Sequence, residues 1–518
     1  MLWSFACGVS AVVLLLLLWA AARVLIWAWW TPRRLERALR QQGLDGTTYR
    51  FLHGDLQDNA LLIKEARSKP MPLSHDIAPR VVPLFVHGMH KYGKLYFTWS
   101  GPVPRVIFTD PVLVREVLSN KFGHFSKPKI PPLARLLMTG LINHEGEKWA
   151  KHRRIVNPAF HMEKLKLMLP AFAACCSYLV ERWENSMSTE GCWELDVWPE
   201  FLNFSGDVIS RTAFGSSYEE GKRIFQLINE EAQLFSQAAQ RLYIPGYRFL
   251  PTSINNRRKA VNREVRALLK GIIEKRVNSL RRGEASNDDL LGLLMKSNAK
   301  EYQEHGNKND SGMSMDDMIG ECKLFYFAGH ETTTVLLTWT MIVLSMHPSW
   351  QEQAREEVLR VFGKNTPDFD GLAHLKIVTM ILYEVLRLYP PAVSIPRQTY
   401  KTIKLGNVTY PPGVLIAMPI ILTHRDKKFW GEDADEFRPE RFAQGVSKAS
   451  KDQVAFFPFG GGPRTCLGMN FALLEAKMGL SMILQSFSFE LSPSYIHAPQ
   501  ILLTLQPQHG AQLRLHRL

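Results

Sequence analysis

The segment from Phe459 to Gly468, FGGGPRTCLG, constrains this chain more than any other. Three consecutive glycines followed by Pro463 exclude helix and strand, and they predict a tight loop whose backbone can approach a flat ligand closely. Cys466 comes next, and the periodic segment after it (GMNFALLEAKMGLSMILQSF) predicts a helix. A cysteine at a helix N-terminus faces unpaired N–H groups that favour the thiolate, and Arg464 adds a positive charge. We therefore expect a thiolate at Cys466, with the Phe459 ring keeping water away from the sulfur.

The sequence around Cys466 contains no second cysteine or histidine, which argues against zinc, because zinc takes about four ligands. A single thiolate suits haem iron, where it pushes electron density toward bound dioxygen and favours O–O cleavage. The alternative is a buried structural cysteine beside a glycine-rich turn.

The first thirty residues predict a membrane anchor. Leu2 to Ala22 carry no charge and are long enough to cross a bilayer as a helix, which takes about 20 residues. After the span come tryptophans suited to the headgroup level and then arginines: Trp27, Trp29, Trp30, Arg33, Arg34, Arg37 and Arg40. Because positive charge follows the span and none precedes it, we expect a single-pass protein of the endoplasmic reticulum membrane with a cytosolic body. The alternative is a cleaved secretory signal, but the stretch lacks a basic start and is longer than the apolar core of such a signal.

Charge and cysteine content narrow the partners and the compartment. The chain has 63 Lys+Arg and 49 Asp+Glu, a formal net charge of +14. This excess suits membrane lipid or an acidic protein partner. No compact basic run with interleaved aromatics occurs, so nucleic acid is not an expected partner. The six cysteines are sparse and irregular, and one lies within the apolar span, which predicts a reducing compartment and no disulfide framework.

Residue patterns predict a mainly α fold with small β-sheets (α+β). We expect residues 1–30 to be the anchor, 31–60 a basic hinge and 61–518 one large domain. Apolar spacing of three and four predicts helices near 110–120, 145–156, 163–189, 219–241, 257–282 and 316–346. Strands are expected at Leu95–Trp99, Arg105–Thr109, Ile403–Leu405, Val414–Met418 and near the C-terminus. The polar stretch 284–312 is expected to be an exposed connection with one short helix, Leu290 to Met295.

The helix predicted over 316–346 contains the string AGHETT, from Ala328 to Thr333. Gly329 and Thr332 are three residues apart and share a face of the helix. A missing side chain and a threonine hydroxyl that can bond a preceding carbonyl would open a groove wide enough for dioxygen. Glu331 adds a carboxyl group beside that hydroxyl, and an acid–alcohol pair can relay protons. Taken alone, the string fits equally well with helix-interior threonines and a core or surface glutamate.

The string F-x-x-G-x-R-x-C-x-G around Cys466 resembles the haem-binding signature of the cytochrome P-450 family at every defined position. Other strings of that family precede it: Trp149-x-x-x-Arg153, Ala328 to Thr333, Glu384-x-x-Arg387, and Phe437 to Phe442. Two longer segments, GEKWAKHRRIVNPAFH and DVISRTAFGSSYEEG, are similar to sequences of the plant seventy-two family in particular. The resemblance covers essentially the whole chain.

This resemblance implies the cytochrome P-450 fold and heme b with its iron ligated by Cys466. It implies that Glu384, Arg387 and Arg441 form a buried structural triad and that Glu331 and Thr332 are catalytic. The residues it implies as cofactor-binding are Trp149, Arg153, Arg397, Phe459, Gly462, Arg464 and Gly468. Arg397 is placed only by its distance after the Glu-x-x-Arg string, and for Trp149 alone a plain core position is the alternative.

The implied activity is a monooxygenase that inserts one oxygen atom from dioxygen into a lipophilic substrate, with electrons from NADPH through a reductase. Members of the seventy-two family oxidise terpenoid-derived skeletons, including hormones, and some oxidise fatty acids or herbicides, so the substrate itself does not follow. By family analogy the pocket draws on residues near 124–145, 236–252, 324–336, 392–397 and 497–501. The alternatives are a non-catalytic membrane haem-binding protein and a peroxide-rearranging haem enzyme. The acid–threonine pair disfavours both.

Overall fold

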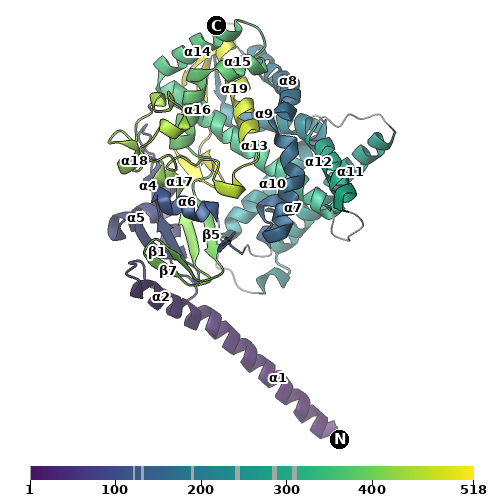
Figure 1. The fold of residues 1–518 in the computed structure, drawn as a ribbon, viewed down its shortest axis with the longest axis vertical. Coiled ribbons are helices and arrows are strands. Elements are labelled where there is room, and N and C mark those ends of the chain that lie inside the picture. The colour runs from purple at the N-terminus through teal and green to yellow at the C-terminus, as the bar shows by residue number, and fades with distance from the viewer. Residues whose placement is uncertain are drawn as a thin grey trace.

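The computed structural model describes residues 2–120, 123–129, 133–187, 192–216, 218–239, 246–282, 289–305 and 312–518. Figure 1 shows a largely helical body from which one long helix, α1 (Leu2–Leu25), projects alone. The helices of the body are α2 (Thr31–Gln41), α3 (Leu56–Ser68), α4 (Ala78–Val81), α5 (Pro83–Tyr92), α6 (Pro111–Ser119), α7 (Gly146–Val156), α8 (Met162–Ser186), α9 (Val197–Phe214), α10 (Tyr218–Ala239), α11 (Ser253–Arg281), α12 (Leu290–His305), α13 (Met315–Met346), α14 (Pro348–Phe362), α15 (Phe369–His374), α16 (Lys376–Leu388), α17 (Ile420–Thr423), α18 (Lys427–Trp430) and α19 (Met469–Ser486). Each helix predicted from the apolar spacing is confirmed.

Within the described residues, four small sheets accompany the helices. The strands are β1 (Leu95–Ser100), β2 (Val103–Phe108), β3 (Phe125–Ser126), β4 (Cys192–Asp196), β5 (Ile395–Thr399), β6 (Ile403–Leu405), β7 (Val408–Tyr410), β8 (Leu415–Met418), β9 (Phe487–Leu491), β10 (Pro499–Ile501), β11 (Leu505–Pro507) and β12 (Gln512–Arg517). The largest sheet has the order β1-β2-β8-β5-β3, in which only the β2–β8 pair is parallel. The others are β4-β12-β9, β10-β11 and β6-β7. The prediction of a mainly α fold with small sheets is therefore confirmed.

Helix α13 forms the centre of the body (Figure 1). It begins at a capping box, in which the Ser314 side chain accepts from the Asp317 N–H and the Asp317 carboxylate accepts from the Ser314 N–H. Most of its side chains are buried, and it packs against α9, α16 and α19. Its buried Trp339 ring stacks on Tyr389 with 4.6 Å between the ring centroids. A helix that is apolar on nearly every face has to lie inside a large core.

The stretch predicted as an exposed connection is only partly so. Helix α12 runs to His305, well beyond the short helix expected from Leu290 to Met295. Its Leu290, Leu291 and Leu294 are buried in the main core, so burial of this stripe stabilises a helix that its polar C-terminal half does not suggest. Residues 284–288 and 306–311 of the predicted connection lie outside the described residues.

Residues 31–60, predicted as a hinge, lie against the body. A π-helical turn, Ile26–Trp30, joins α1 to α2, and the Tyr49 hydroxyl donates to the Ala28 carbonyl over 2.5 Å. The α2 side chains Leu35 and Leu39 are buried. Bridges from Gly46 to Phe97 and from Gly54 to Ser100 connect the segment to β1. The domain limits 1–30, 31–60 and 61–518 stay predictions.

The N-terminal helix has the length and composition of a membrane span. The apolar helical stretch runs over Cys7–Gln41 with a mean hydropathy of 2.5 in its most apolar window, and none of that window is buried in the body. The Arg33 and Arg34 guanidiniums lie 4.8 and 4.9 Å from the ring centroids of Trp29 and Trp30. Charged groups that flank exposed tryptophans at the end of an apolar span fit a membrane interface.

Candidate functional site

The loop before α19 has the tight geometry that its glycines predict. Gly460 and Gly462 have φ angles of +74° and +66°, in the left-handed region that favours glycine. The Cys466 N–H donates to the Phe459 carbonyl over 2.9 Å and closes the loop. A Cβ on Gly462 would lie 2.2 Å from the Leu118 carbonyl oxygen. The missing side chain of Gly462 therefore allows the loop to pack on the end of α6.

The Cys466 side chain is accessible, although protein surrounds its thiol closely enough for burial to dominate the pKa. Burial raises the pKa of the Cys466 thiol, whereas the backbone N–H of Gly468 and the charge of Arg153 act to lower it. The prediction that N–H groups at the start of α19 favour the thiolate is right in direction, but burial outweighs them. Arg464 was expected to act on the sulfur, and the cation that does so is Arg153. The Arg153 Nη1 also donates to the Thr465 carbonyl over 2.8 Å, next to the cysteine.

Four cations gather beside this loop: Lys127 after β3, Arg153 on α7, Arg397 on β5 and Arg464 in the loop itself. Burial and then the charges of Arg464 and Arg397 lower the pKa of Lys127 to about 7. Burial and then Arg464 lower the pKa of Arg397 to about 10. In the described part of the chain, the carboxylate that opposes these shifts is Glu145, which pairs with Arg464 over 2.5 Å. Such a surplus of partly desolvated positive charge suits an anionic ligand.

Trp149 belongs to the same cluster, because the Arg464 guanidinium carbon lies 4.5 Å from the centroid of its ring. The sequence motifs name Trp149, Arg153, Arg397 and Arg464, and the structure brings all of them together. They do not name Lys127 or Glu145. No short-range signal marks these two, since β3 and the start of α7 meet only in the folded chain.

One face of the central helix α13 is open to space within the body. Leu324, Ala328 and Thr332, spaced by four, are exposed or half-buried in a helix whose neighbouring turns are buried. The Thr332 hydroxyl donates to the Ala328 carbonyl over 2.7 Å, as predicted for a threonine at this position. The prediction that Gly329 opens a groove for dioxygen is wrong. A Cβ at Gly329 would lie 2.7 Å from the Ile209 side chain. The space left at Gly329 is filled by Ile209 of α9 and does not form a groove.

Two buried carboxyl groups flank this stretch of α13. Glu331 accepts from the Thr504 hydroxyl and the Gln506 amide, each over 2.5 Å, and burial raises its pKa. Within the described residues, no hydrogen bond joins Glu331 to Thr332. Glu475 on α19 is the second acid. Burial raises its pKa to about 8, although Ser205 and Thr333 nearby act to lower it. Glu475 was not singled out from the sequence, yet an acid within the apolar repeat of α19 was a usable signal.

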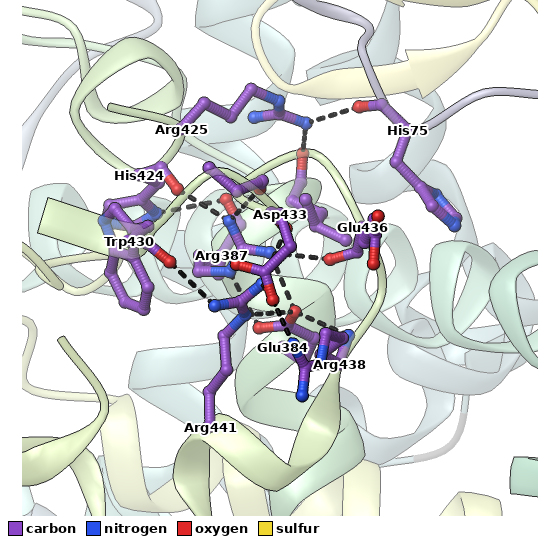
Figure 2. Close-up of polar contacts among 12 residues, drawn as sticks. His75, Glu384, Arg387, His424, Arg425, Trp430, Asp433, Glu436, Arg438 and Arg441 are labelled. Atoms are coloured by element: carbon purple, nitrogen blue, oxygen red, sulfur yellow. Dashed lines mark hydrogen bonds and ion pairs between the residues drawn. The ribbon is translucent and has the colours of Figure 1, made fainter. Parts of the chain in front are cut away.

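The structure places Glu384, Arg387 and Arg441 together, as Figure 2 shows. Arg387 donates from Nε and Nη2 to the two oxygens of Glu384, each over 2.7 Å, and both side chains are fully buried. The Arg441 Nε lies 3.5 Å from Glu384 Oε1, and its Nη2 lies 2.9 Å from Asp433 Oδ2. The backbone N–H of Arg438 also donates to Glu384, over 2.8 Å. The Glu384 carboxylate is therefore fully surrounded by donors, as a buried charge has to be.

The same network reaches the thiolate loop through His424, which sequence reasoning missed. Arg387 donates to the carbonyls of His424, Ala434 and Glu436 over 2.8, 2.5 and 3.0 Å. The His424 ring bonds the Arg387 carbonyl through Nδ1 and accepts from the Phe457 N–H through Nε2, over 3.2 and 3.1 Å. Burial lowers the pKa of His424 far below its usual range, so the ring is neutral and can make both bonds. Arg387 and His424 thus fix the segment at Phe457 that leads into the thiolate loop.

These features fit haem. A thiol that is exposed inside the fold can reach an iron atom, and a metal ion that binds a thiol deprotonates it, whatever its raised pKa. The cation cluster can receive the two propionates of haem, and the open face of α13 provides space beside a hydroxyl group. The fold and this site together define the class of haem-thiolate proteins.

The comparisons with known proteins agree. The family model for cytochrome P450 matches residues 80–514. Cytochrome P450 CYP72A616 of Paris polyphylla is 64% identical over 96% of this chain and 96% of its own length. Secologanin synthase 1 of Catharanthus roseus is 51% identical over 98% of this chain and 97% of its own length. The retinoic acid-bound cyanobacterial CYP120A1 shares the fold, with a TM-score of 0.75 and 22% identity over 92% of this chain and 99% of that one.

This chain belongs to the cytochrome P450 family. It is a haem-containing monooxygenase, and the iron of such enzymes is held by a cysteine. The family implies dioxygen, a redox partner and a lipophilic substrate.

Proposed function

We propose that this protein is a membrane-anchored monooxygenase that oxidises a terpenoid-derived substrate with electrons from an NADPH-dependent reductase. The observation that carries this proposal is an accessible cysteine beside a surplus of buried and half-buried cations. The substrate class rests on the likeness to the plant relatives, one of which is named for the metabolite it makes. Hormone-like compounds and fatty acids are the other candidates.

In this proposal the Cys466 thiolate would hold the haem iron, and Arg153, Arg397, Arg464 and Lys127 would meet the propionates. Trp149 supports the Arg464 guanidinium by cation–π contact. Phe459, Gly462 and Gly468 shape the loop, and the Phe459 ring shields the sulfur. When bound, haem supplies the reductive activation of dioxygen.

The proposed proton route starts at Glu331. Burial raises the pKa of this carboxyl group, which favours its protonated form, and Thr504 and Gln506 fix its position. The Thr332 hydroxyl lies next to the open face of α13, where the substrate and dioxygen have to meet. In this proposal the Thr332 hydroxyl would supply a proton on the open face of α13. Glu331 would replace that proton after its carboxyl group turns from Thr504 and Gln506 toward Thr332.

Replacing Thr332 by alanine should lower product formation by about 10²–10⁴, the usual effect of losing an acid–base group. NADPH oxidation should fall less, because reduced oxygen can leave as hydrogen peroxide. The measurement is product and peroxide per NADPH in vesicles with reductase. The substrate is chosen from a terpenoid, hormone and fatty-acid panel by its shift of the Soret band, and we expect a terpenoid to give that shift.

Thr340 offers a matched control on the same helix. Its hydroxyl donates to the Leu336 carbonyl over 2.7 Å, as Thr332 does to Ala328, but Thr340 is fully buried. Thr340→Ala should keep the coupling of the unaltered enzyme. Equal coupling in Thr332→Ala, Glu331→Ala and Thr340→Ala would contradict the relay. A chain that yields no product with any member of the panel, although NADPH and reductase are present, would contradict the proposed function.

We propose that the span anchors the protein in the endoplasmic reticulum membrane with the body in the cytosol. Three N-x-[S/T] sequons test this, at Asn203, Asn309 and Asn407, and Asn309 lies outside the described residues. Asn407 is exposed in the turn between β6 and β7, so a luminal body would present it to glycosylation. Glycosidase treatment of the expressed protein should leave its gel mobility unchanged, and Asn407→Gln should migrate in the same way. A shift that Asn407→Gln removes would reverse the orientation.

A further inference from the structure

Two histidines and two acids meet between α7 and the start of α13. His144 and His152 lie edge to face, with 4.3 Å between their ring centroids. Ring nitrogens of both and a carboxylate oxygen of Glu321 lie within 4.8 Å of one another. Asp317 Oδ1 is 3.7 Å from His152 Nε2. None of these four groups has a role in the activity proposed above.

His152 has the arrangement of a metal-binding histidine. Its Nδ1 bonds Glu321 Oε1 over 2.6 Å, and Glu321 is itself held by the Leu141 N–H over 3.0 Å. Both side chains are fully buried. A carboxylate that holds one ring nitrogen in this way fixes the tautomer and directs the other nitrogen toward a metal. In the part of the chain that the structure describes, His152 Nε2 is buried and has no hydrogen-bond partner.

Asp317 directs one of its carboxylate oxygens to the same point. Its Oδ2 is used by the capping box, where it accepts from the Ser314 N–H and hydroxyl over 3.2 and 2.8 Å. Its Oδ1 faces His152 and receives the Lys148 ammonium at 2.6 Å. The Lys148 side chain is half exposed, so it can swing away into solvent. The ammonium group thus stands where a cation would bind.

We propose that His144, His152 and Asp317 bind a divalent transition-metal ion of the zinc class at a site separate from the haem. Two imidazoles, a carboxylate and a water complete the tetrahedral set that zinc prefers, with Glu321 as the partner that orients His152. Ligand bonds of about 2.0–2.2 Å in a tetrahedron place the ligand atoms about 3.3–3.6 Å apart, and Asp317 Oδ1 already lies 3.7 Å from His152 Nε2. Ring nitrogens of His144 and His152 lie within 4.8 Å of each other, so the His144 ring has to move closer to His152 when the ion binds. The half-exposed His144 provides the route of entry from solvent.

The proposed metal site is connected to the cation cluster beside the thiolate loop through the backbone of His144. The His144 carbonyl accepts from Arg464 Nη2 over 3.0 Å, and the next residue, Glu145, pairs with Arg464. A metal that draws the His144 ring toward α13 would pull on the carbonyl that holds Arg464. Metal binding is therefore expected to change the Soret band of the haem enzyme slightly, in addition to releasing heat.

The test is isothermal titration of zinc chloride into the tag-free, haem-loaded enzyme. One equivalent should bind, and His144→Ala should weaken binding by more than the 10–100-fold that loss of an orienting partner costs. His161→Ala is the matched control, because His161 is exposed and lies outside the cluster, and it should bind as the unaltered enzyme does. Lys148→Met removes the competing ammonium and should bind zinc more tightly.

The Soret band reports in each variant that the enzyme is folded and loaded with haem. The proposal is wrong if the unaltered enzyme binds no zinc, or if His144→Ala binds it as tightly. It is equally wrong if Lys148→Met does not strengthen binding. None of these results depends on the substrate, so the proposed function is tested separately.

Discussion

Replacing Cys466 by serine is expected to abolish both product formation and the thiolate signature of the reduced carbon monoxide complex. The serine hydroxyl has a far higher pKa than the thiol and is a harder donor, so it does not supply the same electron density to iron. The surroundings of Cys466 strengthen the expectation that the serine variant loses the thiolate signature completely. Burial already opposes an anion here, and the Gly468 N–H and Arg153 compensate only in part.

Cys322 provides the control for this experiment. It lies on α13, fully buried, and burial raises the pKa of its thiol far above the usual range. Cys322→Ala should retain the carbon monoxide spectrum of the unaltered enzyme. The haem content is measured in parallel, because the cation cluster can still hold haem in Cys466→Ser. An unchanged spectrum in Cys466→Ser would show that another cysteine binds the iron.

Replacing Arg387 by alanine should destabilise the protein by about 3–5 kcal/mol, the effect of leaving a buried charge without its partner. The substitution leaves Glu384 with one guanidinium in place of two, and it removes the donor to three backbone carbonyls. It also frees the His424 segment that holds the entry to the thiolate loop. We expect a lower unfolding temperature, measured by circular dichroism. We also expect early loss of haem on heating, measured by the Soret band.

Arg438→Ala is the matched control, since Arg438 contacts Glu384 only through its backbone N–H. Its exposed side chain pairs with Asp433, and an ion pair of this kind contributes little to stability because solvent screens it. Figure 2 shows the two arginines on either side of the same carboxylate. Equal unfolding temperatures for Arg387→Ala and Arg438→Ala would mean that the buried pair does not stabilise the fold.

The sequence predicts well those structural features that depend on residues close together along the chain. The apolar spacing of α13, the apolar run of α1 and the glycines before Cys466 each act over a few residues, and the structure agrees with them. The direction of a side chain depends on which distant segment packs beside it. Glu331 turns to Thr504, and Gly329 makes room for Ile209, partners that no local pattern reveals.

The same distinction explains the residues that were missed. Lys127 and His424 lie in loops without periodicity, and they acquire their roles only when the strands β3 and β5 and the helix α16 come together. Helix α12 was underestimated for the opposite reason. Its polar half favours a loop, while the buried leucines at its start and the pairing of Arg154 with Glu301 hold it as a helix.

The junction between span and body has a mechanical consequence. The chain stays helical from α1 through the π-turn into α2, and the Tyr49 bond to Ala28 together with the Gly46 bridge to β1 fixes that rod to the sheet. The span and the body are therefore expected to change their orientation together, as one rigid unit. A span longer than the local hydrocarbon thickness tilts, so bilayer thickness would set the angle at which the body leans on the membrane. The lipid composition of the membrane would then set which flank of the body faces the bilayer surface.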